Sequence, residues 1–289
     1  MSILLRWLSG RSLGFLHALG AGLGWCAYAF SPSYRRRVRE NAALAGIGTA
    51  PRRAAIAHAG RLVAELPRLW LRAAGRPLEP AVQWQGAELI DAALAAGRGL
   101  VILTPHLGAF EVIAQAYAER FGARQPMTAL YRPARQAWLR ELETTARDRP
   151  GLLTARASLA GVRQMIRALR QGQTVGLLPD QVPPEGLGVW APFFGRAAYT
   201  MTLASRLAQQ TGAEPLLTLC ERLPHGAGWR FHVHALPEPL PMATAFGGDG
   251  VAHQTECAAV INRAMEFLIR QCPEQYLWGY HRYKAPRAP

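Results

Sequence analysis

Lysine is almost absent from this 289-residue sequence, in which Lys284 is the only one. The formal net charge of +14, from 33 Lys and Arg against 19 Asp and Glu, is therefore carried by arginine. Burial does not neutralise arginine, and its planar guanidinium pairs well with phosphate and carboxylate. A basic surface of this kind suits nucleic acid, an anionic membrane or an acidic protein. A genome whose base composition favours arginine codons would give the same arginine content. A basic binding surface and this genomic bias therefore both stay open as explanations.

Cysteine is also scarce, and its pattern excludes several kinds of site. The four cysteines lie far apart and form no Cys-x-x-Cys pair: Cys26, Cys220, Cys257 and Cys272. We expect them to be reduced core residues, because a disulfide framework is not expected in a chain of this length, and this points to the cytoplasmic side. The sequence has no P-loop, no zinc spacing and no aromatic-interleaved basic stripe. We therefore expect no metal, no cofactor and no bound nucleic acid.

The stretch from Ser12 to Phe30 is the most apolar part of the chain and carries no formal charge. At roughly 18 residues it is at the short limit for a helix that spans a bilayer. Four arginines follow it directly: Arg35, Arg36, Arg37 and Arg39. Positive charge beside an apolar helix favours the cytoplasmic side and attracts anionic headgroups. We expect a membrane-associated helix rather than a buried helix of a soluble domain, and both a spanning and an interfacial orientation stay open.

Strand and helix patterns alternate along the rest of the chain. Residues 51–75 predict a helix, because apolar side chains recur three or four apart. Leu100–Thr104 is a continuous apolar run, typical of a strand that is buried on both faces. Further strands are expected at 82–86, 127–130, 174–178, 214–220 and 229–235, and further helices at 88–96, 110–121, 134–147, 158–171, 201–211 and 255–271. The alternation predicts an α/β fold with a mixed central sheet flanked by helices.

The same patterns suggest how the chain is divided. We expect a membrane helix with its basic flank at residues 1–45, and one main domain at residues 46–289. Two segments rich in glycine and proline, 180–195 and 237–251, are expected to be mobile.

The segment Pro105-His106-Leu107-Gly108-Ala109-Phe110-Glu111 follows the buried strand and opens a helix. In such sheets, ligands bind at the turn after the carboxyl end of a strand. A neutral imidazole, with a pKa of about 6.5, can act as a general base toward a hydroxyl. Glu111 could orient the imidazole of His106 and stabilise its charged form. A five-residue spacing within one helix would separate the two side chains, so the pair requires His106 to stand in the turn before the helix.

Several stretches, taken in order, resemble a known family. The His106 segment looks like the H-x4-D/E motif of glycerolipid acyltransferases. Over almost its full length the chain is similar to the lipid A biosynthesis late acyltransferases (lauroyl/myristoyl acyltransferase family). After the apolar helix and the arginine run, the other stretches that carry the resemblance are Asn41, Tyr131-Arg132-Pro133, Arg156 with the helix after it, Asp180-Gln181, and residues 192–200 and 276–284.

This resemblance implies a bacterial inner-membrane enzyme whose acyltransferase domain, residues 46–289, lies on the cytoplasmic face. It implies transfer of a fatty acyl group from a thioester on acyl carrier protein to a hydroxyl of an anionic glycolipid, a lipid A precursor. His106 would be the general base and Glu111 its partner. We expect no acyl-enzyme, because the sequence has no Gly-x-Ser-x-Gly elbow and no cysteine near His106.

The expected substrate-binding residues are Arg132, Arg156, Asp180 and Gln181. The two arginines could clamp a phosphate of the glycolipid or of the donor's phosphopantetheine arm, or form structural salt bridges. Asp180 could orient the substrate or an arginine, or cap a turn. The terminal stretch with Tyr276 and Arg282 is expected mainly to pack.

The acceptor is the least defined part of this prediction. Many members of the family have an acidic residue and a glycine after Asp180-Gln181, whereas this chain has Val182-Pro183-Pro184. A lysophospholipid, or another glycolipid or amino lipid, is therefore an alternative acceptor. A non-enzymatic basic protein that binds membranes or nucleic acid is an alternative of a different class.

Overall fold

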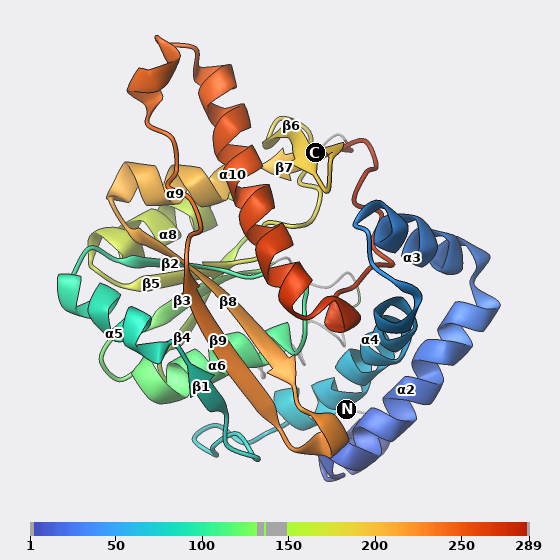
Figure 1. Cartoon of the computed structure of the whole chain (residues 1–289). Helices are drawn as coiled ribbons and strands as arrows, with labels where there is room; N and C mark the ends of the chain where they lie inside the picture. Colours follow the sequence, from blue (N-terminus) through green and yellow to red (C-terminus); the bar gives the residue numbers. More distant parts are fainter. Residues whose placement is uncertain (1–2, 132–135, 137–148, 288–289) are drawn as a thin grey trace.

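A seven-stranded sheet forms the centre of the computed structural model, which describes residues 3–131, 136 and 149–287 (Figure 1). The strand order is β1-β9-β8-β2-β5-β3-β4, and every neighbouring pair is parallel except the antiparallel pair β8 and β9. The strands are β1 (Gln83–Gln85), β2 (Leu100–Leu103), β3 (Met127–Tyr131), β4 (Leu152–Arg156), β5 (Thr174–Leu177), β8 (Glu214–Arg222) and β9 (Trp229–Ala235). The predicted mixed sheet is thus confirmed.

Helices cover both faces of this sheet, and the alternation of side chains along β2 shows how. Val101 and Leu103 pack into a core with α8 (Leu159–Arg170), α9 (Leu203–Thr211) and α10 (Gly250–Gln271). Leu100 and Ile102 point to the opposite face and pack with α5 (Ala87–Ala96) and α6 (Phe110–Phe121). All four residues of β2 are buried, which explains why its sequence is a continuous apolar run.

The N-terminal helices form a group beside the sheet: α1 (Ile3–Ser9), α2 (Leu13–Phe30), α3 (Pro32–Leu44) and α4 (Thr49–Trp70). Helix α2 lies along α4, and a side chain at Gly20, Gly24 or Gly60 would overlap the backbone of the other helix (Figure 1). Among the described helices, α2 is the one whose length and composition would allow it to cross a membrane. The expected boundary after residue 45 falls between α3 and α4, and α2 packs across it.

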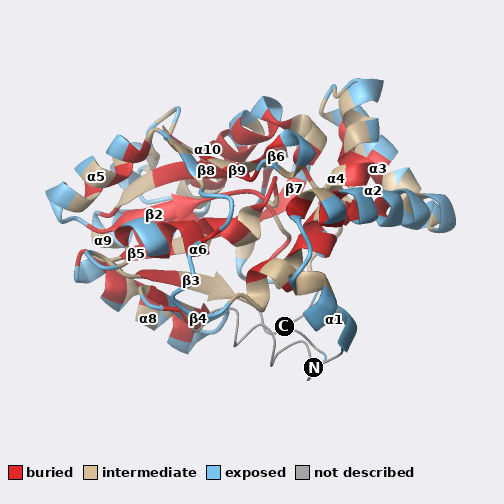
Figure 2. Cartoon of the chain, turned by 90° about the horizontal axis from the view of Figure 1, so that it is seen from below, coloured by how far each residue is buried: buried red, intermediate tan, exposed pale blue. Residues whose placement is uncertain are grey.

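The outer face of this helical group is apolar. Figure 2 shows α1 and much of α2 as exposed. The exposed large apolar side chains of these two helices are Ile3, Leu4, Trp7, Phe15, Leu19, Leu23, Trp25 and Phe30. The buried side of α2 is narrow, and it is the side that faces α4.

Two parts of the sheet region were missed by the sequence patterns. Strand β4 lies within a segment for which no strand was expected, and it forms the edge of the sheet. The segment 180–195, expected to be mobile, contains β6 (Gly188–Phe193), which forms an antiparallel hairpin with β7 (Arg196–Met201). The turn of this hairpin has positive φ at both Phe194 and Gly195, as a type I′ turn requires, and a phenylalanine there gives no sequence signal.

The remaining predicted elements agree with the structure within a few residues. The expected helix at 134–147 lies outside the described residues. Segment 237–251, also expected to be mobile, contains the short 3-10 helix η2 (Ala243–Phe246); the others are η1 (Pro224–Gly226) and η3 (Pro273–Gln275).

Candidate active site

His106 stands in the loop between the end of β2 and the start of α6. It is therefore outside the helix, as the pair with Glu111 required, and Glu111 lies in the first turn of α6. The loop owes its shape to Gly108, whose φ is +61° and where a Cβ would overlap the carbonyl oxygen of Cys220. The predicted strand-to-turn-to-helix arrangement is confirmed.

Asp180 is the described residue that holds the imidazole of His106. The Asp180 Oδ1 atom lies 2.6 Å from Nδ1 of His106, and Asp180 Oδ2 accepts a hydrogen bond of 2.9 Å from the backbone N–H of His106. The strand order explains this contact: β5, which precedes Asp180, is the parallel neighbour of β2, so the loops after both strands meet at one edge. Asp180 was expected to orient substrate or an arginine, or to cap a turn; in the structure it is paired with His106 and lies near Arg282.

Asp180 is 1% exposed, and its surroundings keep it ionised. Burial alone would raise the pKa of Asp180, but the charge of His106, the hydrogen bonds from its ring and backbone, and the charge of Arg282 outweigh burial and lower that pKa. Burial and the negative charge of Asp180 raise the pKa of Tyr276. Asp180 is therefore a carboxylate that accepts at both oxygens.

This arrangement defines how the imidazole can react. An ionised carboxylate only accepts hydrogen bonds, so Nδ1 of His106 carries a proton, and in the neutral form of the ring the lone pair is on Nε2. Among the described residues, none forms a hydrogen bond with Nε2. The His106 side chain is 20% exposed. The site thus presents an oriented imidazole base at the carboxyl edge of the sheet.

Glu111 is held from a different direction. Its Oε2 atom accepts a hydrogen bond of 3.2 Å from Nε1 of Trp70, at the end of α4. The role predicted for Glu111, as the group that orients His106, stays a prediction.

The other expected substrate-binding residues are only partly assembled at this site. Arg132 lies outside the described residues. Arg156 ends the edge strand β4, is exposed, and donates from Nε to the Tyr131 hydroxyl over 3.4 Å. Three strand spacings separate β4 from β2, which corresponds to roughly 14 Å. Gln181 adjoins Asp180 and is half-buried.

Two buried residues near the site were missed by the sequence patterns. Arg282, expected mainly to pack, donates to Tyr199 O and Thr200 Oγ1 and lies near enough to Asp180 to lower its pKa. Arg222 ends β8 and contacts the His106 loop. The one signal for Arg222 was its position after an apolar strand; nothing in the pattern of either arginine pointed to the loop.

A cavity of about 380 Å³ lies at the end of α4, between α1 and the start of β9. Three arginines spaced four residues apart in sequence contribute to its wall, Arg68, Arg72 and Arg76, with Trp229 and Glu79. The charged residues of its wall are therefore mainly basic. In the part of the chain that the structure describes, no three His, Cys, Asp or Glu side chains come together in a way that could hold a metal ion.

Comparison with known proteins adds to this geometry. The chain is 29% identical over 201 residues to the lipid A biosynthesis lauroyltransferase of Escherichia coli (strain K12), covering 69% of this chain and 60% of that protein. It is 27% identical over 202 residues to the lipid A biosynthesis palmitoleoyltransferase of the same organism, with the same coverage, and 27% identical over 204 residues to its lipid A biosynthesis myristoyltransferase, covering 70% of this chain and 58% of that protein. The chain thus spans about 60% of the length of the curated relatives it matches.

One protein family matches the sequence over nearly all of the chain. The bacterial lipid A biosynthesis acyltransferase model matches residues 4–285, which include the His106 loop, Asp180 and the N-terminal helices. The chain therefore belongs to the bacterial lipid A biosynthesis acyltransferase family.

Proposed function

We propose that this protein is a membrane-associated acyltransferase that moves a fatty acyl group from a thioester to a hydroxyl of a lipid A precursor. The observation that carries the proposal is the His106–Asp180 pair at the carboxyl edge of the sheet, in a chain of this family. An oriented, partly exposed imidazole beside a buried carboxylate is what a hydroxyl nucleophile needs for its activation.

The proposed reaction has four proton and bond changes. Nε2 of His106 removes the proton of the acceptor hydroxyl, while Asp180 stabilises the imidazolium that forms. The hydroxyl oxygen attacks the thioester carbonyl and forms a tetrahedral intermediate. The carbon–sulfur bond then breaks, the ester remains on the acceptor, and the imidazolium returns its proton to the leaving thiolate. No covalent bond to the protein is made.

The start of α6 supports the charge that develops in this reaction. No side chain caps this helix, so the Phe110 N–H lies at its positive end, close in sequence to His106. We assign this end of α6, with a nearby arginine, to the oxyanion of the intermediate. Glu111, in the same turn, is proposed as the second catalytic group. It would contact the acceptor or stabilise the positive charge of the imidazolium.

Substrates and location follow from the charges and the apolar surface. The exposed apolar side chains of α1 and α2 suit insertion into the interface of a bilayer, with the arginines of α3 against anionic headgroups. We propose the bacterial inner membrane, with the sheet on the cytoplasmic face. The +14 charge suits an acidic acyl carrier protein as the donor's carrier. Arg132, Arg156 and Gln181 are proposed to bind the anionic acceptor or the donor. Asp180 is proposed to act on these substrates through His106.

Transfer of acyl groups in detergent, from acyl carrier protein to a lipid A precursor, tests this proposal. His106→Ala should lower kcat by about 10²–10⁴, the range for loss of a general base. Glu111→Ala should also lower it. His232→Ala is the matched control, because His232 is also bound to a carboxylate, Glu221 at 3.1 Å, but lies on β9 away from the loop. A folded His106→Ala protein that transfers at the wild-type rate would overturn the mechanism.

The acceptor is tested separately by mass spectrometry of lipids from a strain that lacks the gene. The proposal expects one acyl chain to be missing from lipid A. A missing chain on phospholipids or on another glycolipid, with lipid A unchanged, would show that the reaction type is right and the acceptor wrong.

A further inference from the structure

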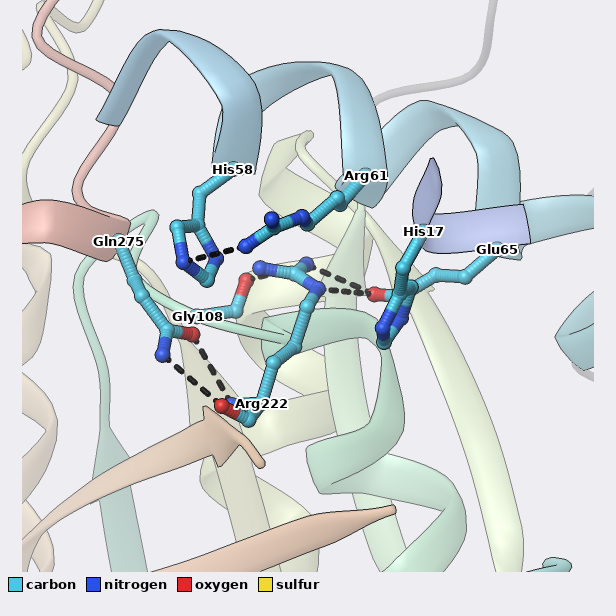
Figure 3. Close-up of polar contacts among 7 residues, drawn as sticks. All are labelled: His17, His58, Arg61, Glu65, Gly108, Arg222 and Gln275. Atoms are coloured by element: carbon cyan, nitrogen blue, oxygen red, sulfur yellow. Dashed lines mark hydrogen bonds and ion pairs between the residues drawn. The ribbon is translucent and has the colours of Figure 1, made fainter. Parts of the chain in front are cut away.

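A buried arginine, Arg222, contacts the backbone of the His106 loop. Arg222 Nη2 donates a 2.7 Å hydrogen bond to the carbonyl oxygen of Gly108, two residues after His106 (Figure 3). Arg222 is 3% exposed. A buried carbonyl that lost its donor would be costly, so this contact favours one conformation of the loop.

The backbone of Arg222 also supports the loop through Gln275. The Gln275 side chain accepts from Arg222 N–H at 2.9 Å and donates to Arg222 O at 3.0 Å. The Gln275 carbonyl in turn accepts the N–H of Gly108 at 3.1 Å. The C=O of Gly108 is therefore bound by Arg222 directly (Figure 3), and its N–H by the backbone of Gln275, whose side chain is bound to the backbone of Arg222.

The other edge of the Arg222 guanidinium is bound to Glu65 of α4. Nε and Nη2 donate to Glu65 Oε1 at 2.9 and 2.7 Å. Glu65 is 0% exposed. Burial alone would raise the pKa of Glu65, but the charge of Arg222 and the hydrogen bonds from His17 and Arg222 outweigh it and lower that pKa. A planar guanidinium suits this place because its fixed fork of N–H groups can serve a carboxylate and a carbonyl together.

The same carboxylate connects the loop to helix α2. Glu65 Oε2 lies 3.2 Å from Nε2 of His17, which is buried on the face of α2 that packs against α4. Figure 3 shows the continuous line of contacts from His17 through Glu65 and Arg222 to Gly108. Residues from α2, α4, β8 and the loop are thus joined in one buried polar chain.

We infer that Arg222 is a positioning residue for the proposed reaction, and that through Glu65 and His17 its hold on the His106 loop depends on α2 being docked against α4. This inference rests on the proposed function for its effect on turnover. The rival explanation is that the buried ion pair only stabilises the fold. The two explanations differ in what happens when both charges are removed together.

The decisive comparison uses Arg222→Met, Glu65→Leu and the double variant. Each single change leaves one buried charge without its partner and should lower the melting temperature markedly. The double variant removes both charges and should recover most of the melting temperature, because apolar replacements of a buried pair are often neutral. Its kcat should still stay about tenfold or more below wild type, with KM little changed, because Gly108 O has lost its donor. Arg230→Met is the matched control, since Arg230 is a partly exposed arginine bound to Gln83 on the outer strands.

Hydrogen exchange gives a readout that does not need activity. The Gly108 and Ala109 amides donate to Gln275 O and Cys220 O at 3.1 and 2.7 Å. In the double variant these amides should exchange about tenfold faster or more, while those of the sheet stay protected. If wild-type protein transferred no acyl group, the proposed function would fall, and the exchange rates would still decide whether Arg222 holds the loop. A double variant with wild-type stability, turnover and loop exchange would overturn the inference.

The contribution of α2 is tested with His17→Leu against Cys26→Ser, a change of an exposed residue on the same helix. His17→Leu should speed exchange in the loop and lower kcat about threefold or more, whereas Cys26→Ser should change neither. Wild-type exchange and turnover in His17→Leu would show that the hold on the loop ends at Glu65, and would overturn the dependence on α2.

Discussion

Two pairs of a buried carboxylate and a histidine occur at or beside the same loop, and they differ in which group neutralises the carboxylate. Asp180 and Glu65 are both almost inaccessible, and the pKa of each is lowered despite burial. Glu65 is bound by two N–H groups of Arg222, a permanent cation, so its charge is balanced whether or not His17 is protonated. Asp180 is directly bound to His106, and Arg282 acts on it through its charge.

In the proposed reaction, this difference gives the Glu65 pair a structural role and the Asp180 pair a chemical one. A carboxylate that already has a fixed cation gains little from protonation of its histidine. A carboxylate without a directly bound fixed cation stabilises an imidazolium when one forms. We therefore expect Asp180 to act mainly on turnover and Glu65 mainly on stability.

Asp180→Asn should give the largest effect and break the chemical pair. A carboxylate accepts both the ring N–H and the backbone N–H of His106, whereas an amide can accept only one of them and places its NH₂ against the other. We expect kcat to fall by about 10³ or more with a small change in melting temperature. Steady-state kinetics and thermal unfolding measure both; a variant that is unstable but has a normal kcat would reverse the roles assigned here.

Glu65→Gln should show the opposite pattern. The amide leaves the charge of Arg222 buried and uncompensated, which costs about 3–5 kcal/mol of unfolding free energy when a buried partner is removed. Denaturant unfolding should detect this loss. If Glu65→Gln lost less stability than Asp180→Asn, the contrast between the two carboxylates would be wrong.

His58 gives the smallest effect and sharpens the comparison, because it lies near Arg222 and has Arg61 as its hydrogen-bond partner. Burial, together with the charges of Arg61 and Arg222, lowers the pKa of His58 to about 3. Between that value and the usual pKa of about 6.5, the unfolded chain binds more protons than the folded one, so stability falls as pH falls. His58 should account for a loss of about 2 kcal/mol between pH 7 and pH 5.

His58→Gln keeps a side chain that can bond to Arg61 but removes the titration. Unfolding free energies of wild type and variant, measured at pH 7 and pH 5, isolate the effect. An equal loss on acidification in both proteins would mean that His58 is not held neutral in the folded state.

The parts of the structure that the sequence predicted are those set by local patterns. The apolar run Leu100–Thr104, the turn with Gly108 and the helix after it are consecutive in the chain, so periodicity and turn chemistry were sufficient to place His106. The contact between His106 and Asp180 depends instead on β5 being the neighbour of β2, although β3 and β4 come between them in sequence. Strand order is set by packing of the whole sheet, which local patterns do not contain.

Local sequence patterns predicted even less of the buried ion pair between Glu65 and Arg222. Glu65 and Arg222 are 157 residues apart; Glu65 lies within a predicted helix and Arg222 lies two residues after a predicted strand. A single acid on an otherwise apolar helix face was a usable signal for Glu65, but nothing identified its partner. Hairpin β6–β7 was missed for another reason, because Phe194 occupies a turn position that usually holds glycine or asparagine.

The contact of α2 with α4 has a consequence for how the protein would sit on a bilayer. At Gly20, Gly24 and Gly60 the two backbones touch, so α2 cannot tilt without moving α4. With α2 in the interface, as proposed, the depth and angle of the whole sheet relative to the lipids would be set by these three glycines. An acceptor hydroxyl would then be selected by its height above the acyl chains as much as by the groups around it.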